Sequence, residues 1–222
     1  MSRLRIAKGR AQVRLKEIED LKEIAQMRQV DLEKEIARMK ELCELGSRFQ
    51  KRRFDTFEVK PEYRMQFNTC KLFAEKFPVA EGKGLYLHGN AGTGKTHLAA
   101  AIANHIIEKK RRQVVFVNHI TLLNRIKQSF ETGEDITAWY KKAPLLIIDD
   151  IGKSKVTDWT REVIYDIVNY RYENELSNVF TSNYDLKALG NMIGIATVSR
   201  IGEMCYVHQF NGSDLRMDGV AE

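Results

Sequence analysis

Apolar residues in the first part of the chain recur every three or four positions, which is the period of an α-helix. Between residues 10 and 45 there is neither proline nor glycine, and good helix formers dominate. The apolar stripe consists of Leu15, Ile18, Leu21, Ala25, Leu32, Ile36, Met39 and Leu42. The pattern predicts one long amphipathic helix that ends at Gly46. Its stripe has to be buried in a hairpin of the same segment, against a second copy or against a partner.

From residue 84 onward, short apolar runs alternate with helical patterns. Runs typical of strands occupy residues 84–88, 113–118, 145–148 and 179–182, and helical patterns occupy residues 96–109, 121–130 and 159–173. The run at 145–148 is apolar throughout, as a central strand of a parallel sheet tends to be. The alternation predicts an α/β domain with a parallel sheet. We therefore expect two domains, a helical extension over residues 1–46 and a sheet domain over residues 47–222.

Composition narrows the class of protein. With 43% hydrophobic and 30% charged residues, the 222-residue chain is typical of a soluble globular protein. No apolar run approaches the roughly 18 residues that span a bilayer, and the first residues lack the apolar core of a signal peptide. The cysteines Cys43, Cys70 and Cys205 are odd in number and widely spaced, which argues against a disulfide framework and a metal cluster. We therefore expect a cytoplasmic protein without a membrane partner.

The positive charge of the chain lies entirely in the extension and the segment that follows it. Residues 1–53 hold 15 Lys and Arg against 9 Asp and Glu, whereas residues 54–222 hold 21 of each. One cluster precedes residue 17, and the other consists of Arg48, Lys51, Arg52 and Arg53. Such clusters attract phosphate backbones or acidic protein surfaces. A solvated helix with a basic linker fits the same pattern, so the charge alone does not identify the partner.

The segment from Gly89 to Thr96 matches the phosphate-binding motif G-x-x-x-x-G-K-[ST] in full, with a predicted strand before it and a predicted helix after it. Its glycines permit backbone conformations and a close approach that a Cβ atom would obstruct. Backbone N–H groups and the positive end of the helix then face the phosphates. Lys95 reaches the β- and γ-phosphates, and the Thr96 hydroxyl binds Mg²⁺. The motif therefore predicts binding of ATP with Mg²⁺ by Gly89, Asn90, Ala91, Gly92, Thr93, Gly94, Lys95 and Thr96.

Two carboxylates, Asp149 and Asp150, follow the apolar run at 145–148. In a parallel sheet they lie at the carboxyl edge, where the phosphate-binding loop also lies. Asp149 fits the acid that holds Mg²⁺ together with Thr96, and Asp150 is positioned to orient or deprotonate the attacking water. The next predicted strand ends at Asn183, whose side chain could bond the γ-phosphate or that water. A strand-ending Asn also serves as an ordinary turn residue.

The order of these motifs resembles one family. The segments YLHGNAGTGKTHLAAAIAN, LLIIDDIG, IVNYRYENE and FTSNYD are similar to the AAA+ ATPases that load bacterial replicative helicases, the DnaC/DnaI type. The preceding segment RFDTFEV resembles the lead-in to the ATPase core of that family. The resemblance covers roughly residues 47–216.

The resemblance implies roles beyond the motifs themselves. Asn183 would be the sensor 1 residue, and Arg200 the arginine finger that reaches the ATP of a neighbouring subunit. His97, which continues the phosphate-binding motif, would join the nucleotide contacts. Arg171 matches a family position of undefined role, and Arg216 would make a further basic contact. The implied partners are a hexameric replicative helicase held by the extension, single-stranded DNA, and further copies of the chain that associate when ATP is bound.

Two departures and two alternatives accompany this interpretation. Only 22 residues follow Arg200, too few for a full C-terminal helical lid, and the extension lacks the zinc domain of some loaders. A transposition helper ATPase of the IstB type, acting on duplex DNA with a transposase, shares most of the motifs. A non-catalytic scaffold gated by nucleotide is the other alternative, and the paired Asp149 and Asp150 argue against it.

Overall fold

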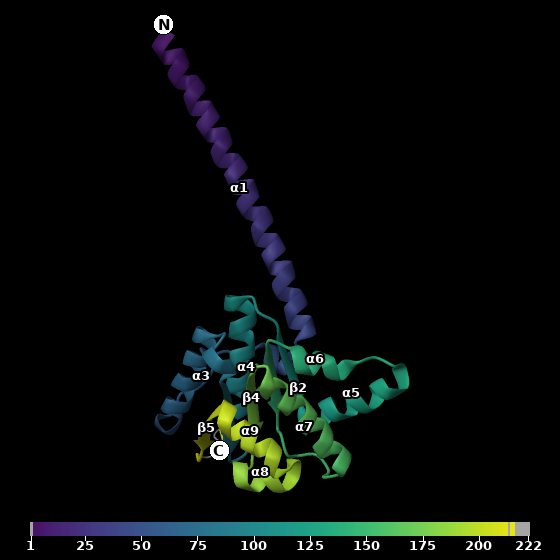
Figure 1. Cartoon of the computed structure of the whole chain (residues 1–222). Coiled ribbons are helices and arrows are strands. Elements are labelled where there is room, and N and C mark those ends of the chain that lie inside the picture. Colours follow the sequence, from purple (N-terminus) through teal and green to yellow (C-terminus); the bar gives the residue numbers. More distant parts are fainter. Residues whose placement is uncertain (1, 213, 216–222) are drawn as a thin grey trace. The chain divides into compact units, whose positions relative to one another are not determined.

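The computed structural model describes residues 2–212 and 214–215, with side chains from residue 21 onward. The chain divides into two compact units, Met1–Arg38 and Met39–Glu222. This division lies eight residues before the domain boundary expected from the sequence, between residues 46 and 47. The extension is one continuous helix, α1 (Ser2–Leu42), with no hairpin (Figure 1). It ends at Leu42 instead of Gly46, because Cys43 and Leu45 are buried in the second unit.

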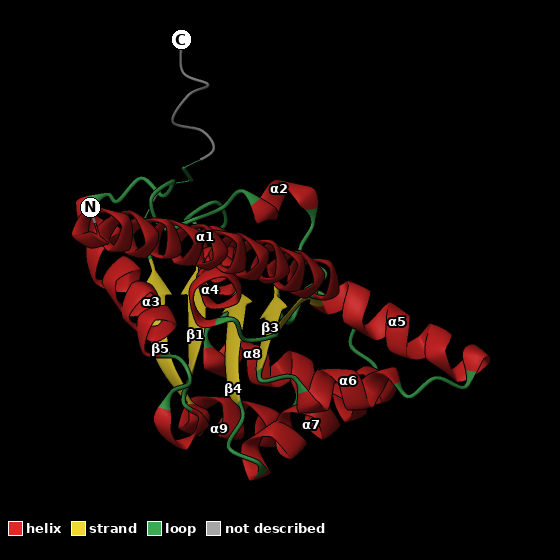
Figure 2. Cartoon of the chain, turned by 90° about the horizontal axis from the view of Figure 1, so that it is seen from above, coloured by secondary structure: helices red, strands yellow, loops and turns green. Residues whose placement is uncertain are grey.

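The second unit is built on a five-stranded sheet whose strands all run in the same direction (Figure 2). The strands are β1 (Gly84–Gly89), β2 (Val114–Asn118), β3 (Leu145–Asp149), β4 (Ser177–Ser182) and β5 (Cys205–Phe210). Their order across the sheet is β2-β3-β4-β1-β5. This order places β1, β4 and β3 side by side, so that their carboxyl ends share one edge.

Helices cover both faces of the sheet, giving three layers. They are α2 (Ser47–Gln50), α3 (Arg64–Lys76), α4 (Lys95–His105), α5 (His119–Thr132), α6 (Ile136–Lys142), α7 (Asp158–Glu173), α8 (Leu186–Ile193) and α9 (Ile195–Met204). Short turns of helix lie at η1 (Pro61–Tyr63) and η2 (Ala80–Gly82), and α4 continues as a π-helix, η3 (Ile106–Lys110).

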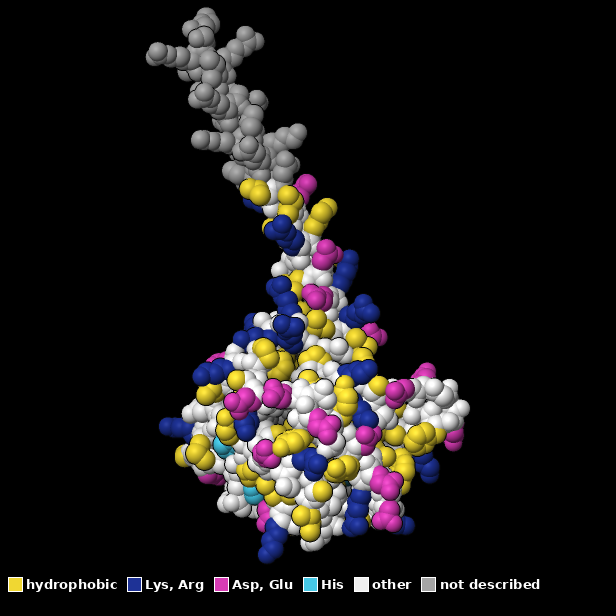
Figure 3. Space-filling view, viewed as in Figure 1, with side chains coloured by type: hydrophobic (Ala, Val, Ile, Leu, Met, Phe, Trp, Pro, Cys, Tyr) yellow, Lys and Arg dark blue, Asp and Glu magenta, His cyan; other side chains and the backbone are white. Residues whose placement is uncertain are grey.

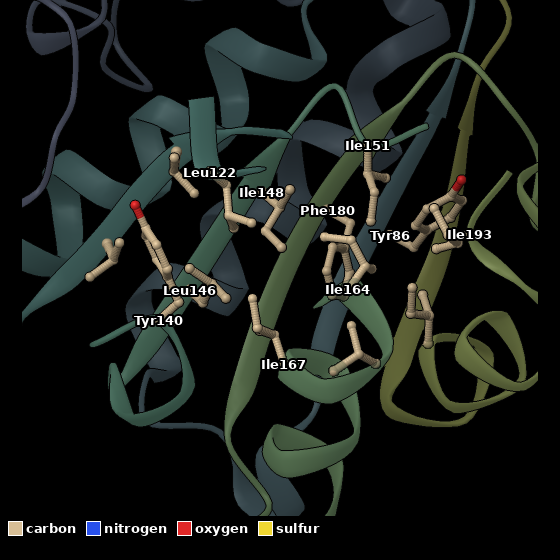
Figure 4. Packing of buried hydrophobic residues seen from close by; sticks show 14 of the residues in the cluster. Tyr86, Leu122, Tyr140, Leu146, Ile148, Ile151, Ile164, Ile167, Phe180 and Ile193 are labelled. Carbon is tan, nitrogen blue, oxygen red and sulfur yellow. The ribbon is translucent and has the colours of Figure 1, made fainter. Parts of the chain in front are cut away.

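The two faces use alternate residues of each strand, because successive side chains of a strand point to opposite sides. Tyr86, Leu146, Ile148 and Phe180 face a core that α5 to α9 complete with residues such as Leu122, Ile164, Ile167 and Ile193 (Figure 4). The intervening strand residues lie beneath α4, which contacts β2, β3 and β4. The parallel α/β fold predicted from the sequence is thereby confirmed.

The structure adds elements that the periodicity did not indicate, namely α3, α6, α8, α9 and the edge strand β5. The described residues beyond β5 form no helical lid. No helix in the described part of the chain has the length and apolar content needed to cross a membrane. Cys43, Cys70 and Cys205 are free and buried, and burial raises the pKa of the Cys43 thiol to about 12.

Candidate nucleotide site

The phosphate-binding loop lies at the carboxyl edge of the sheet, between β1 and α4. Gly89, Gly92 and Gly94 all have positive φ, at 130°, 76° and 91°. A Cβ atom added to Gly89 would lie 2.1 Å from the carbonyl oxygen of Phe210 on the neighbouring strand. One added to Gly94 would lie 2.5 Å from the Phe57 ring. The loop therefore requires glycine for both its conformation and its close packing.

Lys95 lies inside this loop with 5% of its surface exposed. Its ammonium donates hydrogen bonds to the carbonyl oxygens of Gly89 at 2.8 Å and Asn90 at 2.5 Å. It also lies 3.4 Å from Thr93 Oγ1, and that hydroxyl bonds the Asn90 carbonyl. The cation is thus held at the centre of the loop, where the motif predicts that it meets the phosphates.

Thr96 and Asp149 meet although 53 residues separate them. Thr96 Oγ1 donates to Asp149 Oδ1 at 2.8 Å, so the hydroxyl and the carboxylate expected to hold Mg²⁺ lie together. A third residue, Thr181, donates to the same carboxylate oxygen at 2.6 Å and accepts the N–H of Asp150 at 2.9 Å. Sequence reasoning missed Thr181, because a threonine inside a strand carries no distinctive pattern. It lies two residues before Asn183, and that spacing was the available signal.

Burial raises the pKa of the Asp149 carboxyl, and hydrogen bonds from Thr181 and Thr96 oppose that effect. The neighbouring charge of Asp150 raises the pKa further, and Lys153 lowers it. The carboxylate is therefore destabilised as long as no cation lies beside it. Such a group favours a bound divalent cation.

Asp150 has a left-handed backbone with φ of 58°, which is uncommon for a residue with a side chain. Thr181 holds its N–H, and Lys153 Nζ lies 2.8 Å from its carboxylate. Its side chain is partly exposed, unlike that of Asp149. The two acids thus occupy different environments, as expected if one binds a cation and the other contacts water.

Asn183 follows β4, between the ends of β1 and β3. Its side chain is exposed and makes no hydrogen bond within the described part of the chain. The strand order therefore brings Asn183 to the same edge as the loop and the two acids, with its amide available to a ligand.

Arg200 lies away from this edge, on α9. Its guanidinium stacks on the rings of Tyr165 and Tyr172, with its carbon 5.0 Å and 5.7 Å from their centroids. It also donates to Tyr165 Oη and to the Ala196 carbonyl oxygen, both at 3.2 Å. Within one chain Arg200 is therefore held on α7 and α9 and does not join the phosphate-binding loop.

The His97 side chain contacts the lead-in segment instead of the loop interior. Its Nε2 lies 3.0 Å from the Arg53 carbonyl oxygen and 3.3 Å from Thr56 Oγ1. Its ring packs edge-on against Phe57, the residue that also covers Gly94. The lead-in segment noted in the sequence is thereby attached directly to the nucleotide loop.

Arg171 lies at the opposite edge of the sheet and is fully buried. Its guanidinium bonds the carbonyl oxygens of Tyr140, Lys141 and Ala143 at the end of α6, together with Ser177 O and Asn178 Oδ1 at the start of β4. Burial lowers its pKa to about 9. The residue joins α6, α7 and β4, so its role within the chain is structural.

His119 is a buried residue of the site edge that the sequence did not single out. It follows β2, is 1% exposed, and its Nδ1 accepts the N–H of Gly152 at 3.2 Å. Burial lowers its pKa to about 4, so the ring is neutral at physiological pH. It positions the turn that follows Asp149 and Asp150.

The segment after β5 runs back along the phosphate-binding loop. The N–H of Leu215 donates to the Gly92 carbonyl oxygen at 3.1 Å, and the N–H of Asn90 donates to Phe210 O at 3.1 Å. The side chain of Asp214 lies directly against Gly92. Arg216 lies outside the described residues.

The residues present fit a nucleotide with Mg²⁺. The loop is a cradle that Cβ atoms would fill, and Thr96 and Asp149 supply the hard oxygen ligands that Mg²⁺ prefers. No group of three His, Cys, Asp or Glu gathers among the described residues. None is needed, because Mg²⁺ in such sites binds one or two protein ligands and completes its shell with phosphate and water.

Comparison with known proteins agrees with this geometry. The family model of IstB-like ATP binding proteins matches residues 18–218. The replicative helicase loader DnaI of Bacillus subtilis is 39% identical over 108 residues, which are 47% of this chain and 34% of that protein. The uncharacterized protein YqaM of the same organism is 28% identical over 198 residues, 83% of this chain and 63% of that protein. The chain thus spans between a third and somewhat under two thirds of these relatives.

Among solved structures, the crystal structure of the DnaC helicase loader superposes with a TM-score of 0.70 and 32% identity, over 75% of this chain and 100% of that one. A crystal structure of DnaI gives a TM-score of 0.69 and 26% identity, over 80% of this chain and 98% of that one. With the family model matched along most of its length, the chain belongs to the IstB-like ATP-binding proteins and is an AAA+ protein of the DnaC/DnaI type.

Proposed function

We propose that this protein hydrolyses ATP and uses the cycle to place a replicative DNA helicase on single-stranded DNA. The observation that carries the proposal is the hydrogen-bonded group Thr96–Asp149–Thr181 beside the phosphate-binding loop. Several relatives of this chain are named helicase loaders. The site supports the ATPase part, and the relatives support the helicase part.

Each residue at the sheet edge has a role in this reaction. The loop N–H groups and Lys95 bind the phosphates, and Thr96 and Asp149 hold Mg²⁺, which neutralises charge that develops on the phosphates. Asp150 orients the attacking water or accepts its proton, and Asn183 hydrogen-bonds the γ-phosphate or that water. Because Asp150 is partly exposed while Asp149 is buried, the two carboxylates are suited to these different tasks.

Arg200 would act in trans, since its place on α7 and α9 keeps it from the loop of its own chain. When copies associate side by side around ATP, the guanidinium would leave Tyr165 and stabilise transition-state charge in the neighbour. Arg200→Ala should therefore lower assembly-stimulated hydrolysis by about a thousandfold or more and leave nucleotide binding by the monomer unchanged. An equal loss of both would refute the assignment.

The extension would bind the helicase. Its side chains Leu21, Ile24, Met27 and Val30 are between 43% and 68% exposed. Residues 17–44 carry 5 basic and 9 acidic residues, a net charge of −4. An apolar and acidic helical surface of this kind fits a protein partner better than a phosphate backbone.

Size-exclusion chromatography with the replicative helicase of the host, with and without ATP, tests the proposal. The wild type should co-migrate with the helicase, and a chain that begins at Met39 should not. Starting at Met39 keeps Cys43 and Leu45, which are buried in the second unit, so loss of the complex cannot be attributed to unfolding of that unit. Absence of a complex under every nucleotide condition would overturn the loader assignment.

The match to the IstB-like family favours a second candidate, a transposition helper that acts on duplex DNA with a transposase. A preference for duplex over single-stranded DNA at matched salt would support it.

A scaffold without catalysis predicts ATP binding without turnover even when DNA and partner are present.

A further inference from the structure

Two basic runs that are distant in the sequence meet on the second unit. The first follows α1 and includes Arg48, Lys51 and Arg52, and the second is the run of residues 109–112 at the end of η3. Asn104 Nδ2 on α4 donates to the carbonyl oxygens of Phe49 at 3.1 Å and Arg52 at 2.7 Å. Figure 3 shows dark-blue Lys and Arg side chains on the surface of the second unit, with magenta Asp and Glu side chains among them. The basic patch is defined as Arg48, Lys51, Arg52, Lys109, Lys110, Arg111 and Arg112.

Three carboxylates lie in or beside this patch, those of Glu108, Asp55 and Glu75. Glu108 lies within it, but its carboxylate already pairs with Lys40 at 2.6 Å and with Arg53. Apart from the half-buried Arg52, the cations of the basic patch are exposed and form no ion pair within the described residues. Clustered like charges repel one another, and a polyanion relieves that repulsion.

Arg111 closes η3 with a φ of 52°, a left-handed conformation that helix ends usually assign to glycine or asparagine. Glu44, Glu81 and Glu175 have a similar φ, so the conformation is not particular to a cation. The basic patch is therefore distinguished by the placement and exposure of its charges.

Residues 109–112 of the basic patch lie at the opposite end of α4 from the nucleotide loop. Helix α4 begins at Lys95 in that loop and runs to the start of η3. At about 1.5 Å per residue, Lys110 lies roughly 20 Å from Lys95 along the helix. A ligand on residues 109–112 would therefore bind without touching the phosphate-binding loop.

We propose that the basic patch binds the phosphate backbone of nucleic acid without reading its sequence. None of the exposed large hydrophobic side chains of the described residues belongs to 46–53 or 109–112, so the basic patch itself offers no apolar anchor for a bilayer or a peptide. Exposed Lys and Arg suit regularly spaced phosphates, where contacts position the ligand and are indifferent to base identity. This inference deepens the proposed function, because it gives the DNA a place on the ATPase unit.

Fluorescence anisotropy with a labelled oligothymidine strand and with a labelled duplex tests this. The variant Lys109→Gln/Lys110→Gln/Arg112→Gln removes three exposed charges from the basic patch and leaves the left-handed Arg111 in place. Its matched control, Arg64→Gln/Lys76→Gln/Lys187→Gln, removes three exposed charges from α3 and α8. The variant should bind the single strand at least tenfold more weakly at about 50 mM salt, with the slope of log K against log salt reduced by about 2. The control should bind like the wild type.

An equal loss in both variants, or no loss in either, would overturn the inference. Wild-type binding to phosphatidylserine vesicles in the absence of nucleic-acid binding would also overturn it. The patch variant should still hydrolyse ATP and co-migrate with the helicase. Those two assays test the proposed function, whereas the anisotropy assay tests the basic patch. Lys95→Ala should lose ATP binding and keep its affinity for the oligonucleotide.

Discussion

Acidification should destabilise this protein through the buried ring of His119. The group has an ordinary pKa of 6.5 and a pKa of about 4 in the folded chain, because burial disfavours the imidazolium. In the neutral ring, Nδ1 accepts the N–H of Gly152, and protonation would remove that acceptor. The stabilisation contributed by the neutral ring is therefore fully present above pH 6.5 and is lost as pH falls through about 4.

The magnitude follows from the two pKa values. A difference of about 2.5 units corresponds to roughly 3 kcal/mol of unfolding free energy well below pH 4. Between pH 7 and pH 5 the same linkage gives a loss of about 2 kcal/mol, because the unfolded chain gains about 0.7 of a proton at His119 over that interval. The folded chain gains hardly any proton at His119 over the same interval.

Urea denaturation of the wild type and of His119→Asn at pH 7, 6 and 5 measures this loss. Asparagine can accept the Gly152 N–H and does not titrate, so it is the matched control for the hydrogen bond. The unfolding free energy of the wild type should fall by about 2 kcal/mol more than that of the variant between pH 7 and pH 5. Parallel pH profiles would refute the reasoning, because the other histidines are present in both proteins.

Three further substitutions test the site and its support. Arg171→Met should lower the unfolding free energy by about 3–5 kcal/mol in urea, because it leaves four buried oxygen acceptors and one part-buried acceptor without their donor. A variant as stable as the wild type would contradict this. Thr181→Val should lower kcat for ATP at least tenfold with KM nearly unchanged, whereas Thr181→Ser should keep most of the activity. Equal effects of both variants would argue against a role of the hydroxyl group in hydrolysis. Asp149→Asn should abolish magnesium-dependent hydrolysis. The nucleotide-free variant should keep or gain thermal stability, since the amide oxygen can still accept from Thr96 without a buried charge. A lower melting temperature than that of the wild type would argue against the charge effect.

The sequence predicted the parts of the site whose chemistry leaves a local pattern. The phosphate-binding loop depends on glycines at fixed spacing, and the strand at 145–148 is marked by its continuous apolar run. The expected strand limits agree with β1, β2 and β3 to within a residue at either end. Local patterns sufficed because these strands are buried along almost their whole length, which restricts the residue types.

Features that depend on contacts between distant segments could not be predicted in this way. Thr181 became recognisable only when β4 was seen to lie beside β3. The arginine at position 171 looked like a possible functional cation, and its full burial follows from the packing of α6, α7 and β4. Strand β5 was missed because His208 and Gln209 interrupt its short apolar run.

The turn that follows α1 covers part of an exposed edge of the sheet. Strand β2 is an edge of the sheet, and the Cys43 carbonyl oxygen accepts the N–H of Phe116 on its outer side at 2.8 Å. The ion pair between Glu44 and Arg125 fixes this turn to α5. An uncovered edge strand is a template on which another chain can add its own strand, the first step of aggregation. A protein trimmed to begin at residue 47 would lose this cover, so its solubility should fall even though every residue of the nucleotide site is retained.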